Sequence, residues 1–191
     1  MIKKYLSYSI AAACAFTLVC TLQSCTKLAS LLNYDLMLNT GSVKVVIPPY
    51  SDTSSMITLG SGTNSYNVDS FIKANTAGVL GVSNIKSVKL SSCTLTIETR
   101  HATSTNNFAN IKSCTASFYS NSNTTPYSIS LANIPDSSST YLSLPVDSTK
   151  DLSGYISGTT FTYSLAGKLR RATTDTIICT VKFAFNVNVK G

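Results

Sequence analysis

The sequence predicts an all-β protein, an antiparallel β-sandwich of about seven to nine strands. Along several segments apolar and polar residues alternate with period two, which is typical of strands with one buried and one solvated face. Turn-forming residues separate these segments, and no segment has the apolar spacing of a long helix. The sequence shows no repeat at solenoid or propeller spacing, and a closed β-barrel is the alternative fold.

The pattern is clearest at the C-terminus, where the odd positions of 177–189 are all apolar. These positions are Ile177, Cys179, Val181, Phe183, Phe185, Val187 and Val189. The segment 161–165 alternates in the same way, so we expect it to pair with the C-terminal strand. The connecting residues 166–175 include Arg170 and Arg171, as expected of a solvated hairpin loop.

Near the start of the chain, the alternation predicts two separate strands, over 34–38 and 43–47. Proline cannot donate a hydrogen bond to a sheet, so Pro48 and Pro49 are expected to end the second strand. The segment 57–59 is a weaker strand candidate because its alternation is short.

A longer strand is expected over 85–97, with an irregularity in its middle. Its inward positions are even up to Leu90 and odd from Cys93 onwards. A β-bulge produces such a change of phase, and Ser91 and Ser92 are the natural place for it. Further strands are predicted over 111–119, 127–131 and 141–144, with a turn at 133–136 between the last two.

Two short helices are expected between the strands. Asp69 is the predicted cap of a helix over 70–74, and Asp147 or Ser148 the cap of a second helix over 150–155. Side chains of these types accept hydrogen bonds from the free N–H groups at the start of a helix.

The first 24 residues have the layout of a secretory signal peptide. Lys3 and Lys4 precede an apolar run over 10–22, and the small residue Ser24 stands just before Cys25. The tetrapeptide Leu-Gln-Ser-Cys that ends at Cys25 resembles the lipobox of bacterial lipoproteins. This resemblance implies that Cys25 is acylated, with fatty acids such as palmitate, and becomes the N-terminus of the mature protein.

Two other cysteines and an uncleaved anchor are the alternatives. Cleavage before Cys14 would leave a very short apolar region, and Val19 fits poorly in front of Cys20. An uncleaved transmembrane anchor would need about 20 apolar residues, more than the run provides. By the same resemblance, Thr26 in place of an aspartate favours the outer membrane, with the domain facing the periplasm; surface display is the open alternative.

Three regions are therefore expected: the lipoprotein signal peptide 1–24, a lipidated N-terminus with a short tether 25–33, and a single β-sandwich domain 34–191. The formal charge of +7 falls by two, to +5, when Lys3 and Lys4 are removed. Only 12% of the residues are charged and no basic run occurs, so nucleic acid is not an expected partner. The modest excess of positive charge suits a domain held beside anionic lipid headgroups.

The sequence contains no marked constellation of reactive residues, so neither enzymatic activity nor a metal or cofactor site is expected. His101 is the only histidine, and its place after a strand favours a solvated loop residue. The cysteines lack the close spacing of a zinc site, and Glu98 is the only glutamate. The segment 154–158 has glycines on both sides of a serine, but not at the spacing of a nucleophile elbow.

Cys93, Cys114 and Cys179 follow Cys25 in the chain, and all three fall on predicted inward positions. An odd number allows at most one internal disulfide, and Cys93 with Cys114 is the candidate pair if their strands are neighbours. In a direct hairpin these two would be offset by about one step, which disulfide geometry tolerates poorly. We therefore expect three reduced, buried thiols that act as small apolar side chains.

The sequence contains ten tyrosines, which can stack on a ligand, although tryptophan, the usual companion residue in sugar-binding platforms, is absent. Tyr119 and Tyr155 lie near strand ends or loops and are the candidate ligand contacts. The alternative is that both tyrosines pack at the edge of the sandwich with their hydroxyls in water.

Several segments of core and turn residues, together with the lipobox, resemble small Bacteroidetes-type lipoproteins of unknown function. These segments are 84–90, 107–111, 133–135 and 161–189. The resemblance implies an immunoglobulin-like sandwich and carries over no active-site residue. We expect a non-enzymatic lipoprotein, held in the membrane by its lipid, that binds or scaffolds another component of the cell envelope. A carbohydrate-binding subunit of a glycan-uptake or adhesion system is the alternative.

Overall fold

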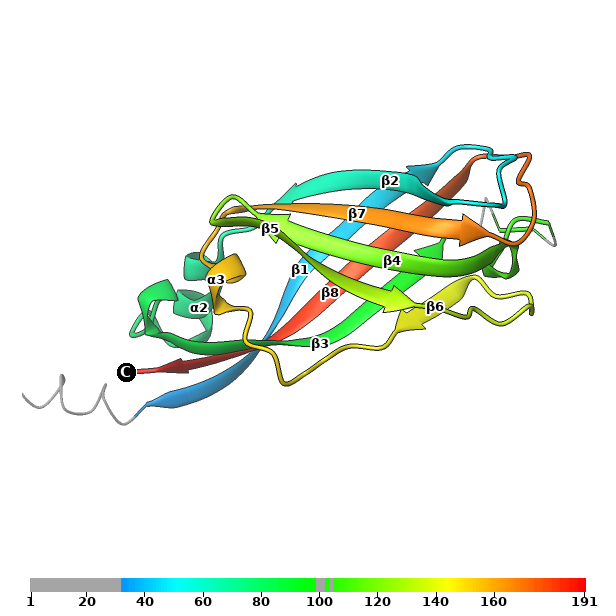
Figure 1. The fold of residues 1–191 in the computed structure, drawn as a ribbon. Helices are drawn as coiled ribbons and strands as arrows, with labels where there is room; N and C mark the ends of the chain where they lie inside the picture. The colour runs from blue at the N-terminus through cyan, green and yellow to red at the C-terminus, as the bar shows by residue number, and fades with distance from the viewer. Residues whose placement is uncertain (1–31, 99–101, 104) are drawn as a thin grey trace, which may run out of the picture.

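The computed structural model describes residues 32–98, 102–103 and 105–191. The predicted signal peptide 1–24, the acylated Cys25 and the histidine His101 lie outside the described residues. Within the described residues, eight strands form two four-stranded antiparallel sheets that pack face to face (Figure 1). The predicted all-β antiparallel sandwich of seven to nine strands is thereby confirmed.

The strands are β1 (Asn33–Ile47), β2 (Met56–Ser65), β3 (Ile85–Ile97), β4 (Ile111–Ser120), β5 (Asn123–Leu131), β6 (Tyr141–Leu144), β7 (Thr160–Leu169) and β8 (Ile177–Lys190). The helices are α2 (Val68–Asn75) and the single turn α3 (Ser153–Ile156), with 3-10 turns η1 (Val82–Asn84) and η3 (Phe108–Asn110). One sheet has the order β1-β8-β3-β6, and the other has the order β2-β7-β4-β5.

The strand order is that of a jelly roll. The first strand pairs with the last, β2 with β7, β3 with β6 and β4 with β5, as if one long hairpin had been rolled into a sandwich. This connectivity differs from the immunoglobulin-like order that the lipoprotein resemblance implied, in which the first two strands are neighbours in one sheet.

The predicted pairing of the last two strands was wrong. β7 pairs with β2 and β4, whereas β8 pairs with β1 and β3, so the connection between β7 and β8 crosses from one sheet to the other. β7 also continues to Leu169, which leaves 170–176 as the connection. Alternation identified both strands correctly but carries no information about which strand is the neighbour.

The two strands expected over 34–38 and 43–47 are one strand, β1, with a register shift between Asn39 and Ser42. Gly41 lies in this bulge with a φ of 82°, a backbone conformation that glycine adopts without strain. The bulge predicted in β3 is confirmed, because the register with β8 shifts between Leu90 and Ser92.

Both predicted helix caps were wrong. Asn67 caps α2 by accepting from the Ser70 N–H at 2.9 Å, whereas Asp69 lies in the first turn and pairs with Lys73 at 2.6 Å. The helix α3 is shorter than expected and has no side-chain cap. Asp147 instead binds its own turn at Thr149.

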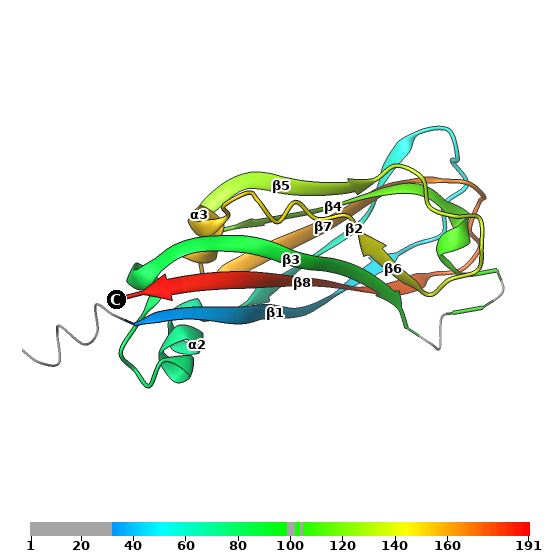
Figure 2. The same cartoon turned by 90° about the horizontal axis from the view of Figure 1, so that it is seen from below.

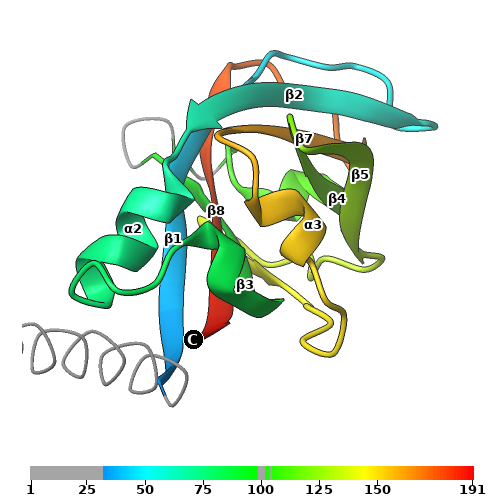
Figure 3. The same ribbon diagram turned by 90° about the vertical axis from the view of Figure 1, so that its left-hand side faces the viewer.

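The sandwich has two different ends. The start of β1 and the end of β8 lie together at one end, with α2 and α3 beside them, which we call the helical end (Figures 1 and 3). The connections β1–β2, β3–β4, β5–β6 and β7–β8 gather at the opposite end, which we call the loop end (Figures 1 and 2). Between the ends, rings from both sheets fill the core, where Phe118 contacts Phe183 and Phe185 with centroids 5.2 and 5.4 Å apart.

Candidate functional site

Arg170 joins three segments at the loop end. It follows β7 directly, and its backbone N–H donates to the Asn110 carbonyl at 2.7 Å. Its guanidinium donates to the carbonyls of Ala109 and Ile134, each at 2.5 Å. One guanidinium is therefore hydrogen-bonded to both η3 and the β5–β6 connection and ties these two loops together.

Arg171 and Asp136 form an ion pair at the surface of this cluster. The Nη2 of Arg171 donates to both carboxylate oxygens of Asp136, at 2.6 and 2.7 Å. The hydrogen bond from Arg171 holds the pKa of Asp136 below its usual range, so the carboxylate is ionised at neutral pH. Both side chains are about half exposed, 51% for Arg171 and 50% for Asp136, so both groups also face solvent.

Three asparagines in the β3–β4 connection are buried and support the loops. Asn107 caps η3 by accepting from the Ala109 N–H at 2.9 Å. Asn110 donates to the Thr105 carbonyl, and Asn106 donates to Asp175 at 3.2 Å. Buried amides that are hydrogen-bonded in this way fix loop backbone at little cost, because each replaces a contact with water.

Two depressions lie on either side of the loop segment 134–139. The first, which we call the polar pocket, has a volume of about 410 Å³ and is lined by Thr105, Asn107, Ala109, Asn110, Asp136, Ser138, Arg171 and Ala172. The second, which we call the aromatic pocket, has a volume of about 160 Å³ and is lined by Phe108, Ile134, Pro135, Ser137, Ser139, Tyr141 and Leu142. Alternate residues of the same loop therefore face the two pockets.

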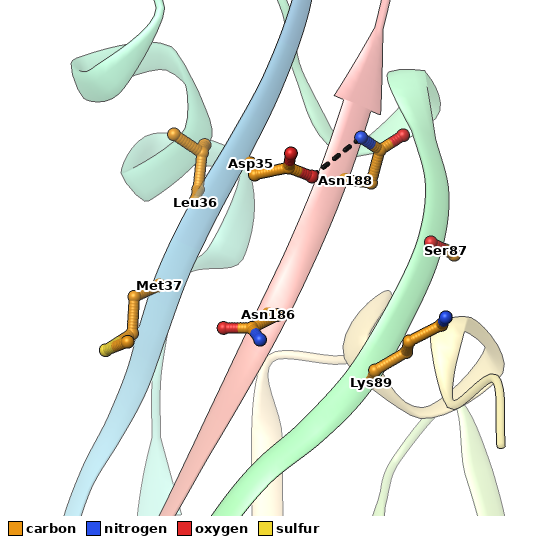
Figure 4. A pocket seen from close by; sticks show the side chains of 7 residues that line it. All are labelled: Asp35, Leu36, Met37, Ser87, Lys89, Asn186 and Asn188. Atoms are coloured by element: carbon orange, nitrogen blue, oxygen red, sulfur yellow. Dashed lines mark hydrogen bonds between the residues drawn. The ribbon is translucent and has the colours of Figure 1, made fainter. Parts of the chain in front are cut away.

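A larger depression of about 520 Å³ lies on the outer face of the β1-β8-β3 sheet (Figure 4). Its side chains come from regular strand positions on three neighbouring strands, and Asn188 is held by Asp35 at 2.8 Å. Figure 4 shows these side chains spread along the strands rather than directed at one point. The loop end is the stronger candidate site because side chains from three connections meet there.

The structure places the two predicted ligand contacts elsewhere. Tyr155 lies in α3 and packs its ring against Phe118 and Tyr127, with centroids 5.3 and 6.4 Å apart. Tyr119 is the neighbour of Phe118 in β4 and so points to the opposite face of its sheet. Both tyrosines lie toward the helical end, so the structure brings neither of them to the loop-end pockets.

Sequence reasoning missed the loop-end residues. The sequence predicts only a solvated hairpin loop at Arg170 and Arg171 and only a turn at 133–136. Two features of the sequence could have indicated this site, but only weakly. They are the two adjacent arginines directly after a strand and the three asparagines close together at 106–110. Neither pattern indicates that these segments meet.

Cys93, Cys114 and Cys179 are free and buried, as expected. Cys93 and Cys114 lie in different sheets, so the hairpin considered for them does not exist. Burial raises the pKa of Cys93 and Cys179 to about 12 and that of Cys114 to about 11. Among the described residues, no group of three histidine, cysteine or acidic side chains is arranged to hold a metal ion. Over the same residues, no helix combines the length and apolar character needed to cross a bilayer.

No protein-family model and no curated protein sequence matches the chain. Several solved structures of viral proteins are similar to the chain in fold. The structure of the infectious bursal disease virus Gx strain has a TM-score of 0.39 and 12% identity, over 85% of this chain and 33% of that one. A Desmodium yellow mottle tymovirus chain has a TM-score of 0.30 and 10% identity, over 84% of this chain and 91% of that one. The chain spans about a third of the first of these, and no conclusion about function follows from likeness at this level.

Proposed function

We propose that the protein is a lipid-anchored β-sandwich of the bacterial cell envelope that binds or scaffolds another envelope component and catalyses no reaction. The observation that carries this proposal is the sequence Leu-Gln-Ser-Cys at positions 22–25, after two lysines and an apolar run. Two or more acyl chains on Cys25 would make attachment effectively permanent, since each buried methylene contributes ~0.8 kcal/mol. By the lipoprotein resemblance the membrane is the outer one, with the domain facing the periplasm.

The layout of the fold supports this proposal. Strand β1 begins at Asn33, so the tether from Cys25 can span at most about 28 Å even when fully extended. A lipid at Cys25 would therefore keep the helical end close to the bilayer. Because β1 has 15 residues and is about 50 Å long, the loop end would be presented well away from the membrane.

Replacement of the acylated cysteine tests the anchor. We expect Cys25→Ala to move the protein from the membrane fraction to the soluble fraction or to leave an uncleaved precursor, because no thiol remains to be acylated. Cys14→Ala and Cys20→Ala are the matched controls and should fractionate with the membrane as the unchanged chain does. Membrane association of a Cys25→Ala chain whose signal peptide has been removed would refute the anchor, and mass spectrometry of the mature N-terminus reports the acyl group directly.

Crosslinking in intact cells tests the binding role. A reproducible envelope protein joined to the unchanged chain supports the proposal. A purified mature chain that converts a substrate in an activity screen would contradict its non-enzymatic part.

A second candidate function is carbohydrate binding, as a subunit of a glycan-uptake or adhesion system. The observation that favours it is the loop-end arrangement, in which charged and amide side chains border one pocket and the exposed Tyr141 borders the next. A glycan array tests this candidate. Reproducible binding of one class of oligosaccharide would support the candidate, and an array without signal would exclude it.

A further inference from the structure

We infer that the polar and aromatic pockets at the loop end form one glycan-binding site, in which the polar pocket binds sugar hydroxyls and the aromatic pocket receives the apolar face of a sugar ring. This inference rests on the second candidate function and assigns its location. A sugar ring has hydroxyls around its edge and C–H groups on its faces, so recognition of an oligosaccharide uses polar and apolar surfaces that lie close together.

The loop 134–139 provides this combination of surfaces. Asp136 and Ser138 face the polar pocket, whereas Pro135, Ser137 and Ser139 face the aromatic pocket. The two pockets therefore lie next to each other, with this loop between them. A ligand of two or more sugar units can reach across the loop and use both pockets.

The polar pocket offers complementary hydrogen-bonding groups. The carboxylate of Asp136 accepts hydrogen bonds, and the guanidinium of Arg171 donates them, and both are half exposed while bonded to each other. A sugar hydroxyl is both donor and acceptor, so it can bind beside this pair without leaving either charge unpaired. Hydrogen bonds to charged groups are stronger than those to neutral groups.

The aromatic pocket offers a flat apolar surface at its rim. Tyr141 is the first residue of the edge strand β6, and its side chain is 55% exposed. The rest of the pocket is lined in part by Phe108, Ile134 and Leu142, which belong to the core. The ring of Tyr141 is therefore the accessible aromatic surface beside the polar pocket.

The site is held in place before any ligand binds. Arg170 connects η3, the β5–β6 connection and the end of β7 through backbone carbonyls, and Asn107 fixes the start of η3. Little conformational entropy is then lost on binding. The polar pocket alone, at about 410 Å³, lies within the range of about 300–1,000 Å³ that is usual for small-molecule sites.

The test is binding of the detergent-extracted mature chain to an array of defined oligosaccharides of glucose, galactose, mannose and xylose. The oligosaccharide with the strongest signal is then titrated calorimetrically against variants. We expect Tyr141→Ala and Asp136→Asn each to weaken binding by about tenfold or more, because each removes one half of the site. Tyr141→Phe keeps the ring and should bind within about twofold of the unchanged chain.

Tyr119→Ala is the matched control, since it removes a tyrosine from a sheet face remote from the loop end, and it should not change the affinity. Thermal unfolding of each variant separates lost binding from lost folding; Tyr141 is exposed, so its replacement should leave the melting temperature unchanged. Glycan binding that survives both Tyr141→Ala and Asp136→Asn overturns this site but leaves the carbohydrate function standing. An array without signal overturns both, and a crosslinked protein on the loop end would then favour the first proposed function.

Discussion

At the scale of single residues, one hydroxyl pair links the two sheets through the core. The Tyr163 hydroxyl on β7 donates to the Thr40 hydroxyl in the β1 bulge at 2.7 Å, and both residues are buried. Asn64 donates to the Thr40 carbonyl at 2.6 Å, so the bulge is held from the second sheet twice. The bulge therefore turns Thr40 into the core at a place where Tyr163 supplies a hydrogen-bond partner.

Removal of this hydroxyl should destabilise the fold. We expect Tyr163→Phe to lower the free energy of unfolding by about 1–2 kcal/mol, because the buried Thr40 hydroxyl loses its partner. Urea unfolding followed by far-UV circular dichroism measures the change. In the double variant with Thr40→Val, the two losses should not add, since both remove the same hydrogen bond. Fully additive losses would show that the pair is not coupled.

The three core thiols cannot form a disulfide in the folded protein. Cys93 lies opposite Phe183 and Cys179 opposite Ile97 in the β3–β8 ladder, which puts Cys93 and Cys179 four positions apart, about 13 Å along the strands. Cys114 lies in the facing sheet, about 10 Å away across the core. A disulfide requires Cα atoms within about 7 Å.

These thiols should therefore remain reduced even in an oxidising compartment, and they should be protected from reagents. Their raised pKa values, about 11 to 12 through burial, leave almost no thiolate at pH 8. We expect iodoacetamide to label none of the three in the native chain and all three in 8 M urea without reductant, as read by mass spectrometry. Rapid labelling of the native chain would mean that the core opens, and incomplete labelling in urea would reveal a disulfide.

At the scale of elements, local periodicity was sufficient to find most strands. The alternation over 177–189 depends only on which face of β8 is buried, and all seven odd positions are buried. The bulge at Leu90–Ser92 was predictable for the same reason, because a change of phase is visible in the strand itself. The exact agreement of β6 with 141–144 follows equally from local pattern.

Neighbouring strands and the loop-end site were not predictable in this way. The contacts of Arg170 with Ala109 and Ile134 join residues 61 and 36 positions apart, and no local pattern encodes such a distance. The alternation predicts two strands over 34–38 and 43–47, because it is interrupted at the β1 bulge; the partner of Thr40 in this bulge, Tyr163, is 123 positions away. Sequence pattern defined the strands, whereas long-range hydrogen bonds define the site.

Strand β2 packs closely against β1 at Gly60, which has no side chain. A Cβ on Gly60 would lie 2.5 Å from Val45 Cγ1 and 2.8 Å from the Val46 carbonyl. Gly60→Ala should therefore lower the free energy of unfolding by about 1–3 kcal/mol, because backbone and core must both shift. The urea midpoint measures the loss.

Gly154→Ala is the matched control for Gly60→Ala. A Cβ on Gly154 would have only the Asn123 amide within reach, at 3.8 Å, so this variant should be neutral or more stable by about 0.4–1 kcal/mol. Equal effects of the two substitutions would show that the close contact between β1 and β2 is unimportant.

At the scale of the whole molecule, two kinds of titratable group limit the stability. Hydrogen-bonded carboxylates limit it in acid, whereas buried thiols and a buried phenol limit it in alkali. Hydrogen bonds from Arg171 and from Lys73 hold the pKa values of Asp136 and Asp69 below their usual range. Their contribution is present above the unfolded-state pKa, about 4, and is lost as the pH falls through the lower folded-state values. Both carboxylates are exposed, so we expect only a gradual loss of stability in acid.

On the alkaline side the groups are buried and the loss should be steeper. Burial raises the pKa of Cys93, Cys179 and Tyr163 to about 12, so each stabilises the fold fully below its unfolded-state pKa and loses this effect as the pH rises. The unfolded-state pKa values are about 8.5 for cysteine and about 10 for tyrosine, so the stability should decline from about pH 8.5 upward.

Urea midpoints measured from pH 3 to pH 11 should form a plateau between about pH 5 and pH 8 and should fall more sharply above this plateau than below it. Tyr163→Phe should make the fall above pH 10 shallower, because the phenol no longer ionises in the unfolded chain. Constant midpoints between pH 8 and pH 11 would contradict the burial of these groups, since an accessible thiol or phenol titrates alike in both states.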